Sequence, residues 1–156
     1  MASDTDLTVV VPVRDAAATI EDLTHLLAEV DGLGTHLVLV DDGSRDGTSQ
    51  VLRRMAGLIP NVDALFHEAS RGAGVARNHG FEHARRRYTL FFDADDHPHV
   101  QTIRRAVELL DESQADVAVM PYDFHGDGAQ VSRGMMPPTP RFGATRHVSP
   151  LIGSRT

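Results

Sequence analysis

Three carboxylates stand within four residues at Asp93, Asp95 and Asp96, directly after the apolar run from Tyr88 to Phe92. This pattern is typical of a buried strand that ends in an acidic loop. Carboxylates so close together repel one another unless a cation, an arginine or water offsets their charge. The stretch by itself supports two interpretations, a divalent metal site at the carboxyl end of a strand or a solvated acidic turn before a helix.

Strand-like and helix-like segments alternate along most of the chain. Short runs rich in Val and Leu predict buried strands, and amphipathic spacing predicts the helices between them. The predicted strands cover residues 7–13, 37–40, 62–66, 88–92 and 117–120, and the predicted helices cover residues 19–30, 48–56, 75–86 and 100–110. This alternation indicates an α/β fold with a mostly parallel sheet and helices on both faces. Pairing of the first strand should end near Pro12, which lacks an N–H.

Two further predicted strands also end in polar residues. Residues 7–13 lead into Arg14 and Asp15, and residues 37–40 lead into Asp41 and Asp42. Ligands of parallel sheets bind beyond the carboxyl ends of the strands, where the strand order reverses. Because these ends meet at one edge, we expect the polar groups to converge with the acidic loop, which favours the metal-site interpretation.

Composition limits the classes of function. The chain has 156 residues, which is the length of one domain, and it has no Cys, which excludes disulfides, thiolate metal sites and a Cys nucleophile. A net charge of −7 and a pI near 5.6 argue against nucleic acid as a partner. The sequence has no apolar run long enough for a membrane span and no signal-peptide pattern. We expect a cytoplasmic protein and leave peripheral membrane association open.

Four motifs in order give the sequence a specific resemblance. They are VVVPVRD at residues 9–15, VDDGSRDGT at 40–48, GVARNHG at 74–80 and FDADD at 92–96. Together they resemble the successive motifs of family 2 glycosyltransferases, over about residues 7 to 124. The resemblance implies the Rossmann-like GT-A fold, truncated here after about the fifth strand. It also implies a nucleotide-sugar (donor) binding domain over residues 1–125 and an irregular tail over residues 126–156 that begins an incomplete acceptor region.

The resemblance implies roles for residues near the nucleobase. The backbone of Pro12, Val13 and Arg14 would hold the base together with Asp41, which would accept from the uracil N3–H if the donor is a uridine nucleotide. Arg14 stands where the family more often has a Tyr-Asn ending, so the role of its side chain stays open.

The resemblance also implies roles near the diphosphate. Asp93 would face the ribose or the metal, and Asp95 would bind a Mg²⁺ or Mn²⁺ ion that bridges the diphosphate. Arg71 or Arg77 would lie near the phosphate or the sugar, at a loop and first helical turn where backbone N–H groups also favour anions.

The reaction implied by the resemblance is inverting transfer of a sugar, with UDP-sugar as the expected donor, to a hydroxyl of a saccharide or lipid-linked acceptor in polysaccharide or glycolipid synthesis. The attacking hydroxyl needs a general base, which in the family is an acidic residue well beyond the fifth strand. No acidic residue follows Asp127, so no catalytic base is assigned.

Three alternatives follow from the same residues. The missing base favours a donor-binding module that does not transfer. A nucleotidyltransferase could share the sheet and the metal site, but it would carry a Gly-rich loop with a Lys after the first strand, and residues 13–17 contain neither. His79 and His83 are four apart on a predicted helix, a spacing that can bind zinc, although no third ligand is in view.

Overall fold

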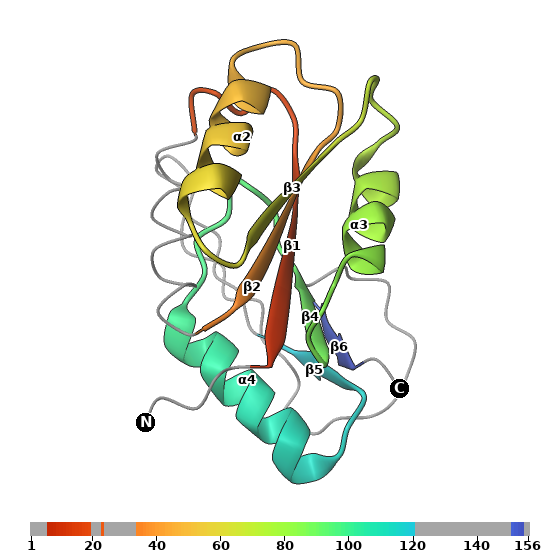
Figure 1. Cartoon of the computed structure of the whole chain (residues 1–156). Coiled ribbons are helices and arrows are strands. Elements are labelled where there is room, and N and C mark those ends of the chain that lie inside the picture. The colour runs from red at the N-terminus through yellow and green to blue at the C-terminus, as the bar shows by residue number, and fades with distance from the viewer. Residues whose placement is uncertain (1–5, 20–22, 24–33, 121–150, 155–156) are drawn as a thin grey trace, which may run out of the picture.

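The computed structural model of the chain describes residues 6–19, 23, 34–120 and 151–154. Its strands are β1 (Leu7–Val13), β2 (His36–Asp41), β3 (Val62–Phe66), β4 (Tyr88–Phe91), β5 (Val117–Val119) and β6 (Leu151–Ser154). Its helices are α2 (Thr48–Leu58), α3 (Ala73–Glu82) and α4 (Val100–Ser113). Figure 1 shows the strands as one twisted sheet with helices packed along it.

The sheet has the strand order β3-β2-β1-β4-β6-β5. The pairs β1–β2, β1–β4 and β2–β3 are parallel, whereas β6 lies antiparallel between β4 and β5. The chain moves outward from β1 through β2 to β3 and then returns to β4 on the other side of β1. The strand order therefore reverses between β1 and β4, and the expectation of a mostly parallel sheet is confirmed.

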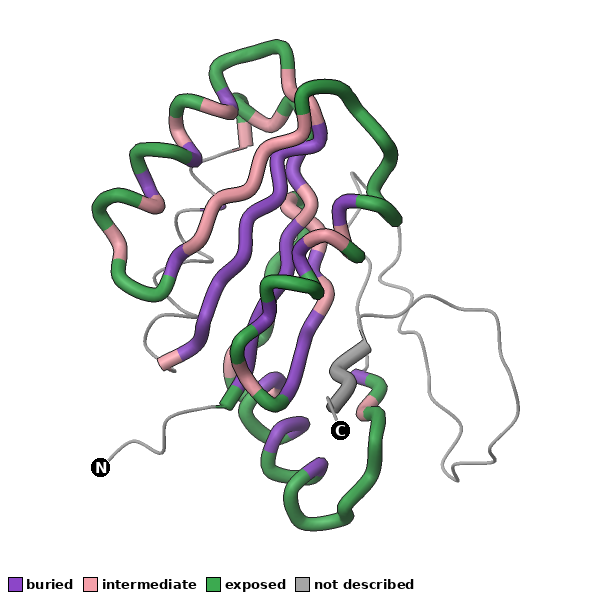
Figure 2. The backbone as a smooth tube through the Cα atoms, turned by 45° about the vertical axis from the view of Figure 1, so that its right-hand side comes forward, coloured by how far each residue is buried: buried purple, intermediate pink, exposed green. Residues whose placement is uncertain are grey.

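Side chains on alternate positions of β1 enter two separate cores. Val9, Val11 and Val13 face a large core that contains residues of α2 and α4, whereas Val10 faces a smaller core that contains Ala76 of α3. This is the two-residue period of a strand buried on both faces. Figure 2 shows the buried central strands between partly exposed helices. The sheet therefore carries helices on both faces, as predicted.

Helix α3 approaches the sheet closely at Gly80. A Cβ atom at this position would lie 2.4 Å from Val10 Cγ1 and 3.0 Å from Val40 Cγ2, and both valines are fully buried. The absence of a side chain at Gly80 thus sets the distance between α3 and the central strands. Because α3 begins at Ala73, this seating also fixes the position of the loop that precedes it.

The amino ends of the strands are closed by a cluster of polar groups, which we call the amino-edge cluster. It consists of Thr8, His36, Asp63 and Arg85. His36 Nε2 lies 3.1 Å from Asp63 Oδ2, and its Nδ1 lies 3.3 Å from Thr8 Oγ1. The Arg85 guanidinium donates to the same Asp63 oxygen at 3.0 Å. Burial lowers the pKa of His36 despite the carboxylate of Asp63, so His36 packs as a neutral side chain.

Most predicted elements are confirmed, and the corrections are local. Helix α3 begins two residues earlier than predicted and ends at Glu82, and α4 extends to Ser113. The predicted helix over residues 19–30 lies almost wholly outside the described residues. Strand β6 was not predicted, since it lies in the stretch assigned to an irregular tail, and it adds a sixth strand to the sheet. The domain boundary near residue 125 stays a prediction.

Pro12 ends strand pairing on one side only. On the β4 side, pairing stops at Val10, but on the β2 side it continues to Val13, which pairs with Asp41. The reason is that successive backbone groups of a strand point to opposite neighbours. The carbonyl of Val10 accepts from Phe92 on the β4 side, and that of Val13 accepts from Asp42 on the β2 side. The missing N–H of Pro12 therefore faces β4 and leaves the β2 ladder intact.

Candidate functional site

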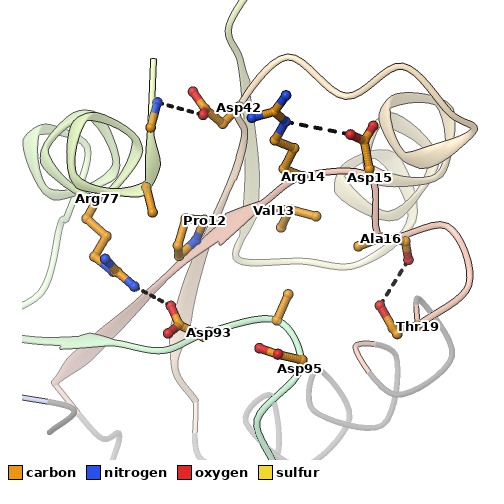
Figure 3. A pocket seen from close by; sticks show the side chains of 13 residues that line it. Pro12, Val13, Arg14, Asp15, Ala16, Thr19, Asp42, Arg77, Asp93 and Asp95 are labelled. Atoms are coloured by element: carbon orange, nitrogen blue, oxygen red, sulfur yellow. Dashed lines mark hydrogen bonds and ion pairs between the residues drawn. The ribbon is translucent and has the colours of Figure 1, made fainter. Parts of the chain in front are cut away.

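An open cavity of about 490 Å³ lies beyond the carboxyl ends of β1, β2 and β4. Its walls come from the end of β1, the end of β2, the start of α3 and the loop after β4, as Figure 3 shows. The lining residues are Pro12, Val13, Arg14, Asp15, Ala16, Thr19, Asp42, Gly72, Ala73, Arg77, Asp93, Ala94 and Asp95. The cavity lies at the reversal of strand order, where parallel sheets bind their ligands.

The structure brings most of the predicted site residues together in this cavity. Those that line it are Pro12, Val13, Arg14, Arg77, Asp93 and Asp95. Asp41 and Arg71 do not line it. Arg71 contributes its backbone N–H to the site by donating to Asp42 Oδ1 at 2.9 Å. The roles proposed for these residues toward a ligand stay predictions.

Asp41 is buried beside the cavity, and its carboxylate already accepts two hydrogen bonds. The backbone N–H of Ser44 donates to Oδ1 at 2.9 Å, and the hydroxyl of Ser49 donates to Oδ2. Asp41 is 1% exposed. In this arrangement Asp41 joins the end of β2 to the first turn of α2, and its proposed contact with a nucleobase stays a prediction.

Asp42 lines the cavity and anchors the loop that leads into α3. Its Oδ1 accepts from Arg71 N at 2.9 Å and lies 2.8 Å from His67 Nδ1. Its Oδ2 accepts from Ser70 Oγ at 2.7 Å and from Gly72 N at 2.9 Å. Burial acts to raise the pKa of Asp42, but these four hydrogen bonds outweigh it and hold the pKa well below the ordinary value. The carboxylate therefore stays ionised.

The motif at residues 40–48 supports the cavity loop after β1. Ser44 Oγ accepts from Asp15 N at 2.9 Å, and Thr48 Oγ1 accepts from Ala16 N at 2.9 Å. Thr48 is fully buried at the start of α2. The backbone N–H groups of Asp15 and Ala16 have no partner in a strand or helix, and these side chains satisfy them. The two bonds therefore fix the path of residues that line the cavity.

Gly43 allows the loops after β2 and β3 to touch. Its φ is +70°, and a Cβ atom there would lie 2.5 Å from Ser70 N and 2.6 Å from Ala69 C. Neither backbone contact can relax as a flexible side chain would. Gly43 is therefore required both for its left-handed conformation and for this close approach.

The loop after β4 carries the predicted metal-binding carboxylates. Asp93 Oδ1 lies 2.5 Å from the Arg77 guanidinium, and Asp95 is exposed at the cavity. Burial raises the pKa of Asp96, and the charges of Asp93 and Asp95 raise it further. Arg77 pairs with Asp93, so the loop carries more carboxylates than this arginine offsets, and a bound cation would reduce the repulsion among them.

These carboxylates fit a Mg²⁺ or Mn²⁺ ion that is shared with a ligand. Among the described residues, no three His, Cys, Asp or Glu side chains are grouped to hold a metal by themselves. Mg²⁺ commonly takes one or two protein carboxylates and completes its octahedron with phosphate oxygens and water. Asp93 and Asp95 match that partial set. His79 and His83 belong to no metal-binding group within the described ranges either, so the zinc alternative gains no support.

The cavity also carries two arginines that can bind phosphate. Arg14 donates to Ser70 Oγ at 2.8 Å and lies 3.6 Å from Asp15 Oδ2, and Arg77 pairs with Asp93. The side chains of Arg14 and Arg77 are 53% and 29% exposed, so both remain accessible from the cavity. A guanidinium can exchange such a carboxylate contact for a bidentate contact with phosphate.

The sequence alone placed Asp15 and Asp42 at this edge of the sheet without giving either a role, and it did not assign Gly72 to the site. Asp41 and Asp42 are adjacent and identical, and only the direction of each side chain at the end of β2 separates a supporting residue from a lining one.

The same structure contains no helix, among the residues it describes, that is long and apolar enough to cross a membrane.

Comparisons with known proteins agree with this fold and site. The model of the family "Glycosyl transferase family 2" matches residues 8–151. The chain is 30% identical to the putative teichuronic acid biosynthesis glycosyltransferase TuaG of Bacillus subtilis, over 68% of this chain and 42% of that protein. The crystal structure of Staphylococcus aureus TarS in complex with UDP-GlcNAc superposes with a TM-score of 0.63 and 30% identity, over 71% of this chain and 32% of that one.

A third similar structure contains a metal. The mannosyltransferase PcManGT of Pyrobaculum calidifontis, in complex with GDP-Man and Mn²⁺, superposes with a TM-score of 0.62 and 28% identity, over 72% of this chain and 34% of that one. The fold is thus the GT-A type of α/β fold shared with nucleotide-sugar-dependent transferases. The chain belongs to glycosyl transferase family 2. It spans less than half the length of the three relatives described here.

Proposed function

We propose that this chain forms the donor-binding part of a glycosyltransferase that transfers a sugar, with inversion, from a metal-bound nucleoside diphosphate sugar to an acceptor hydroxyl. The observation that carries the proposal is one cavity, at the reversal of strand order, that combines Asp93 and Asp95 with Arg14 and Arg77. Carboxylates for a cation and guanidinium groups for phosphate are the pair of chemistries that a diphosphate needs.

The described residues would divide the work as follows. Backbone groups of Pro12, Val13 and Arg14 and the carboxylate of Asp41 would hold the nucleobase, with uridine as the expected nucleoside. Arg77 would exchange Asp93 for the diphosphate, and Asp93 would then turn to the ribose or the metal with Asp95. A bound Mg²⁺ or Mn²⁺ would neutralise the diphosphate as it departs. The acceptor, taken to be a saccharide or a lipid-linked saccharide, and the catalytic base are not assigned to described residues.

The proposal is tested by titration calorimetry of the chain with UDP, GDP and CDP, each with Mn²⁺, with Mg²⁺ or with EDTA. We expect UDP to bind best and EDTA to weaken its affinity at least about tenfold, since a metal bridge replaces unfavourable carboxylate–phosphate repulsion. Asp95→Asn should lose the metal dependence. Binding of no nucleotide, or metal-dependent binding by Asp95→Asn equal to that of the parent, would contradict the proposed donor site.

Donor hydrolysis and sugar transfer separate the enzyme from a binding module. The sequence alternative of a module without transfer predicts that the chain binds UDP with Mn²⁺ but releases no sugar from UDP-sugar. Release of sugar to water or to an acceptor would exclude that alternative. The control is Asp95→Asn, in which turnover should fall together with metal-dependent binding.

A further inference from the structure

A line of three polar side chains runs behind the donor cavity, from the end of β2 to α3. His67 Nδ1 lies 2.8 Å from Asp42 Oδ1, and His67 Nε2 lies 2.9 Å from His79 Nδ1. The two imidazole rings are nearly parallel, at 12°. The side chains of Asp42 and His67 are 4% and 6% exposed. We call these three side chains the Asp42–His67–His79 line. The proposed donor chemistry does not use its two histidines.

The geometry determines which atoms carry protons. Since Asp42 stays ionised, His67 Nδ1 must carry a proton and donate it to the carboxylate. The contact between His67 Nε2 and His79 Nδ1 then has room for one proton. In the neutral pair, His79 donates that proton to His67. If a proton is added at His79 Nε2, the shared proton moves to His67, and the contact survives with the charge beside Asp42.

A second added proton cannot be accommodated. It would place two N–H groups against each other across a 2.9 Å contact, so the rings would have to separate. Other charged groups near this contact are Arg71 from the loop, Glu82 at the end of α3, and His83 directly after it. Burial lowers the pKa of His79, and the charges of His67 and His83 lower it further. These surroundings favour retention of the singly shared proton.

The Asp42 end of the line supports the wall of the cavity. The Asp42 carboxylate holds the hydroxyl of Ser70 and the backbone N–H groups of Arg71 and Gly72. Gly72 lines the cavity and has a φ of +93°, so the path of this loop depends on contacts rather than on helix or strand pairing. Rotation of Asp42 would release all three donors at once.

We propose that His67 and His79 are positioning residues of the donor site: they share one proton behind Asp42 and thereby fix the carboxylate that holds the 70–72 loop against the cavity. The link to donor binding rests on the proposed function, whereas the proton sharing and the loop contacts belong to the free protein. The two parts can therefore be tested separately.

The first test uses the free chain. Long-range ¹H–¹⁵N imidazole spectra between pH 5 and 8, taken as about the range in which histidines titrate, should show His67 Nδ1 protonated throughout. The two rings should take up protons in two separate steps. A His67 Nδ1 without a proton at neutral pH, or two rings that titrate independently, would overturn the proton sharing.

The second test measures amide hydrogen exchange of Arg71 and Gly72. In His67→Phe, which loses both contacts, exchange of these amides should accelerate at least about tenfold, while amides of β1 and β2 stay protected. In His67→Asn, whose side-chain amide can still donate to Asp42, exchange should return to within about threefold of the parent. Unchanged exchange in His67→Phe would overturn the positioning role.

The matched control is His83→Gln. His83 lies beside His79, with ring centroids 5.0 Å apart, but its Nδ1 contacts the His79 carbonyl rather than the line of side chains. We expect parent-like exchange at Arg71 and Gly72 in this variant. If His67→Phe does not fold, His79→Phe tests the role of His79 by itself, because it removes the shared proton while His67 can still donate to Asp42. Exchange at Arg71 and Gly72 should then rise by about threefold. Exchange in His79→Phe equal to that of the parent, together with independent titration of the two rings in the parent, would overturn the proposal.

The third test connects the line to the donor. With Mn²⁺ present, His67→Phe should bind UDP at least about tenfold more weakly than the parent, and His67→Asn should recover most of that loss. If the parent binds no UDP, the donor function fails, while the imidazole spectra and amide exchange still decide the proton sharing. If the parent binds UDP and His67→Phe binds it equally well despite a loosened loop, the link to the donor site is overturned.

Discussion

At the amino ends of β2 and β3, His36 contacts Asp63, and at their carboxyl ends, Asp42 contacts His67. The same two residue types thus meet at both ends of the same two strands, with the roles of the strands exchanged. At the amino edge, Thr8 and Arg85 complete the contacts, and none of the four residues lines the cavity. At the carboxyl edge, Asp42 both lines the cavity and holds its loop.

The surroundings of an Asp–His pair, and not the pair itself, decide its function. Parallel strands leave their carboxyl ends joined to helices by loops whose backbone donors need partners, and those loops enclose a ligand site. At the amino ends, the chain returns from helices, and the polar groups satisfy one another. The amino-edge cluster is therefore a matched reference for every experiment on the carboxyl edge.

Loss of the Asp42 carboxylate should affect the carboxyl edge most strongly. Asp42→Asn should weaken UDP binding in the presence of Mn²⁺ at least about hundredfold, because several charge-assisted hydrogen bonds to the loop are lost together. Asp63→Asn, the matched change at the amino edge, should leave UDP affinity within about twofold of the parent. Calorimetry of both variants checks this pair, and equal losses in the two would contradict the assignment of function to one edge.

The next effect concerns the backbone of the carboxyl edge. Gly43→Ala should lower the free energy of unfolding by at least about 2 kcal/mol, from a left-handed φ and a clash with the 69–70 backbone. Gly57→Ala is the control, because a Cβ there has no atom within 4 Å and the residue lies within α2. That change should raise stability by up to about 1 kcal/mol. Urea unfolding measures both, and a neutral Gly43→Ala would show that the two loops can separate freely.

The two edges should also lose stability in different pH ranges. Burial lowers the pKa of folded His36 below the ordinary 6.5, so the unfolded chain binds the proton first, and stability falls as pH drops below about that value. Hydrogen bonds outweigh burial and lower the pKa of Asp42 below the ordinary 3.8, so its contribution is present above 3.8 and is lost as pH falls further.

Urea unfolding as a function of pH separates these ranges. His36→Asn should reduce the slope of stability between pH 7.5 and 5, taken as about the range around an ordinary histidine pKa. His79 contributes in the same direction, since its pKa is also lowered by burial. Asp42→Asn should reduce the slope only below about pH 4. If the free energy of unfolding still depends on pH near neutrality after substitution of both His36 and His79, then other groups cause that dependence.

Loss of the Arg85 side chain should have only a small effect on the amino-edge cluster. Arg85 pairs with Asp63, but its side chain is 70% exposed. Arg85→Ala should change the free energy of unfolding by less than about 1 kcal/mol, as is usual for exposed ion pairs. UDP affinity should not change. A larger loss of stability would mean that Arg85, and not only His36, holds Asp63 in place.

Much of this fold could be predicted from periodicity, and less of the site could. The continuous apolar runs of β1 and β2 and the amphipathic face of α4 identify their elements, because each pattern has one arrangement that buries its apolar groups. The acidic loop with Asp93 and Asp95 could also be placed at the cavity, because the carboxyl ends of parallel strands meet at one edge of the sheet. Asp41 and Asp42 could not be distinguished, since their roles depend on side-chain direction.

Other features depend on contacts between distant residues, which a local pattern does not encode. His67 was not singled out, because its partners Asp42 and His79 come from different elements. Strand β6 could not be predicted, because Leu151–Ser154 contains a Gly and has no alternating pattern. It also pairs with strands that lie far away in sequence.

The position of β6 has a consequence for the order in which the sheet assembles. Strand β5 pairs only with β6 among the described strands, and β6 in turn pairs with β4. As the chain leaves the ribosome, β1 to β4 can form their parallel core and the cavity before residue 151 is synthesised. β5 must wait for β6 to arrive, so the two strands beyond β4 join the sheet through long-range pairing. We therefore expect assembly to begin around the cavity and to end at the β5 edge.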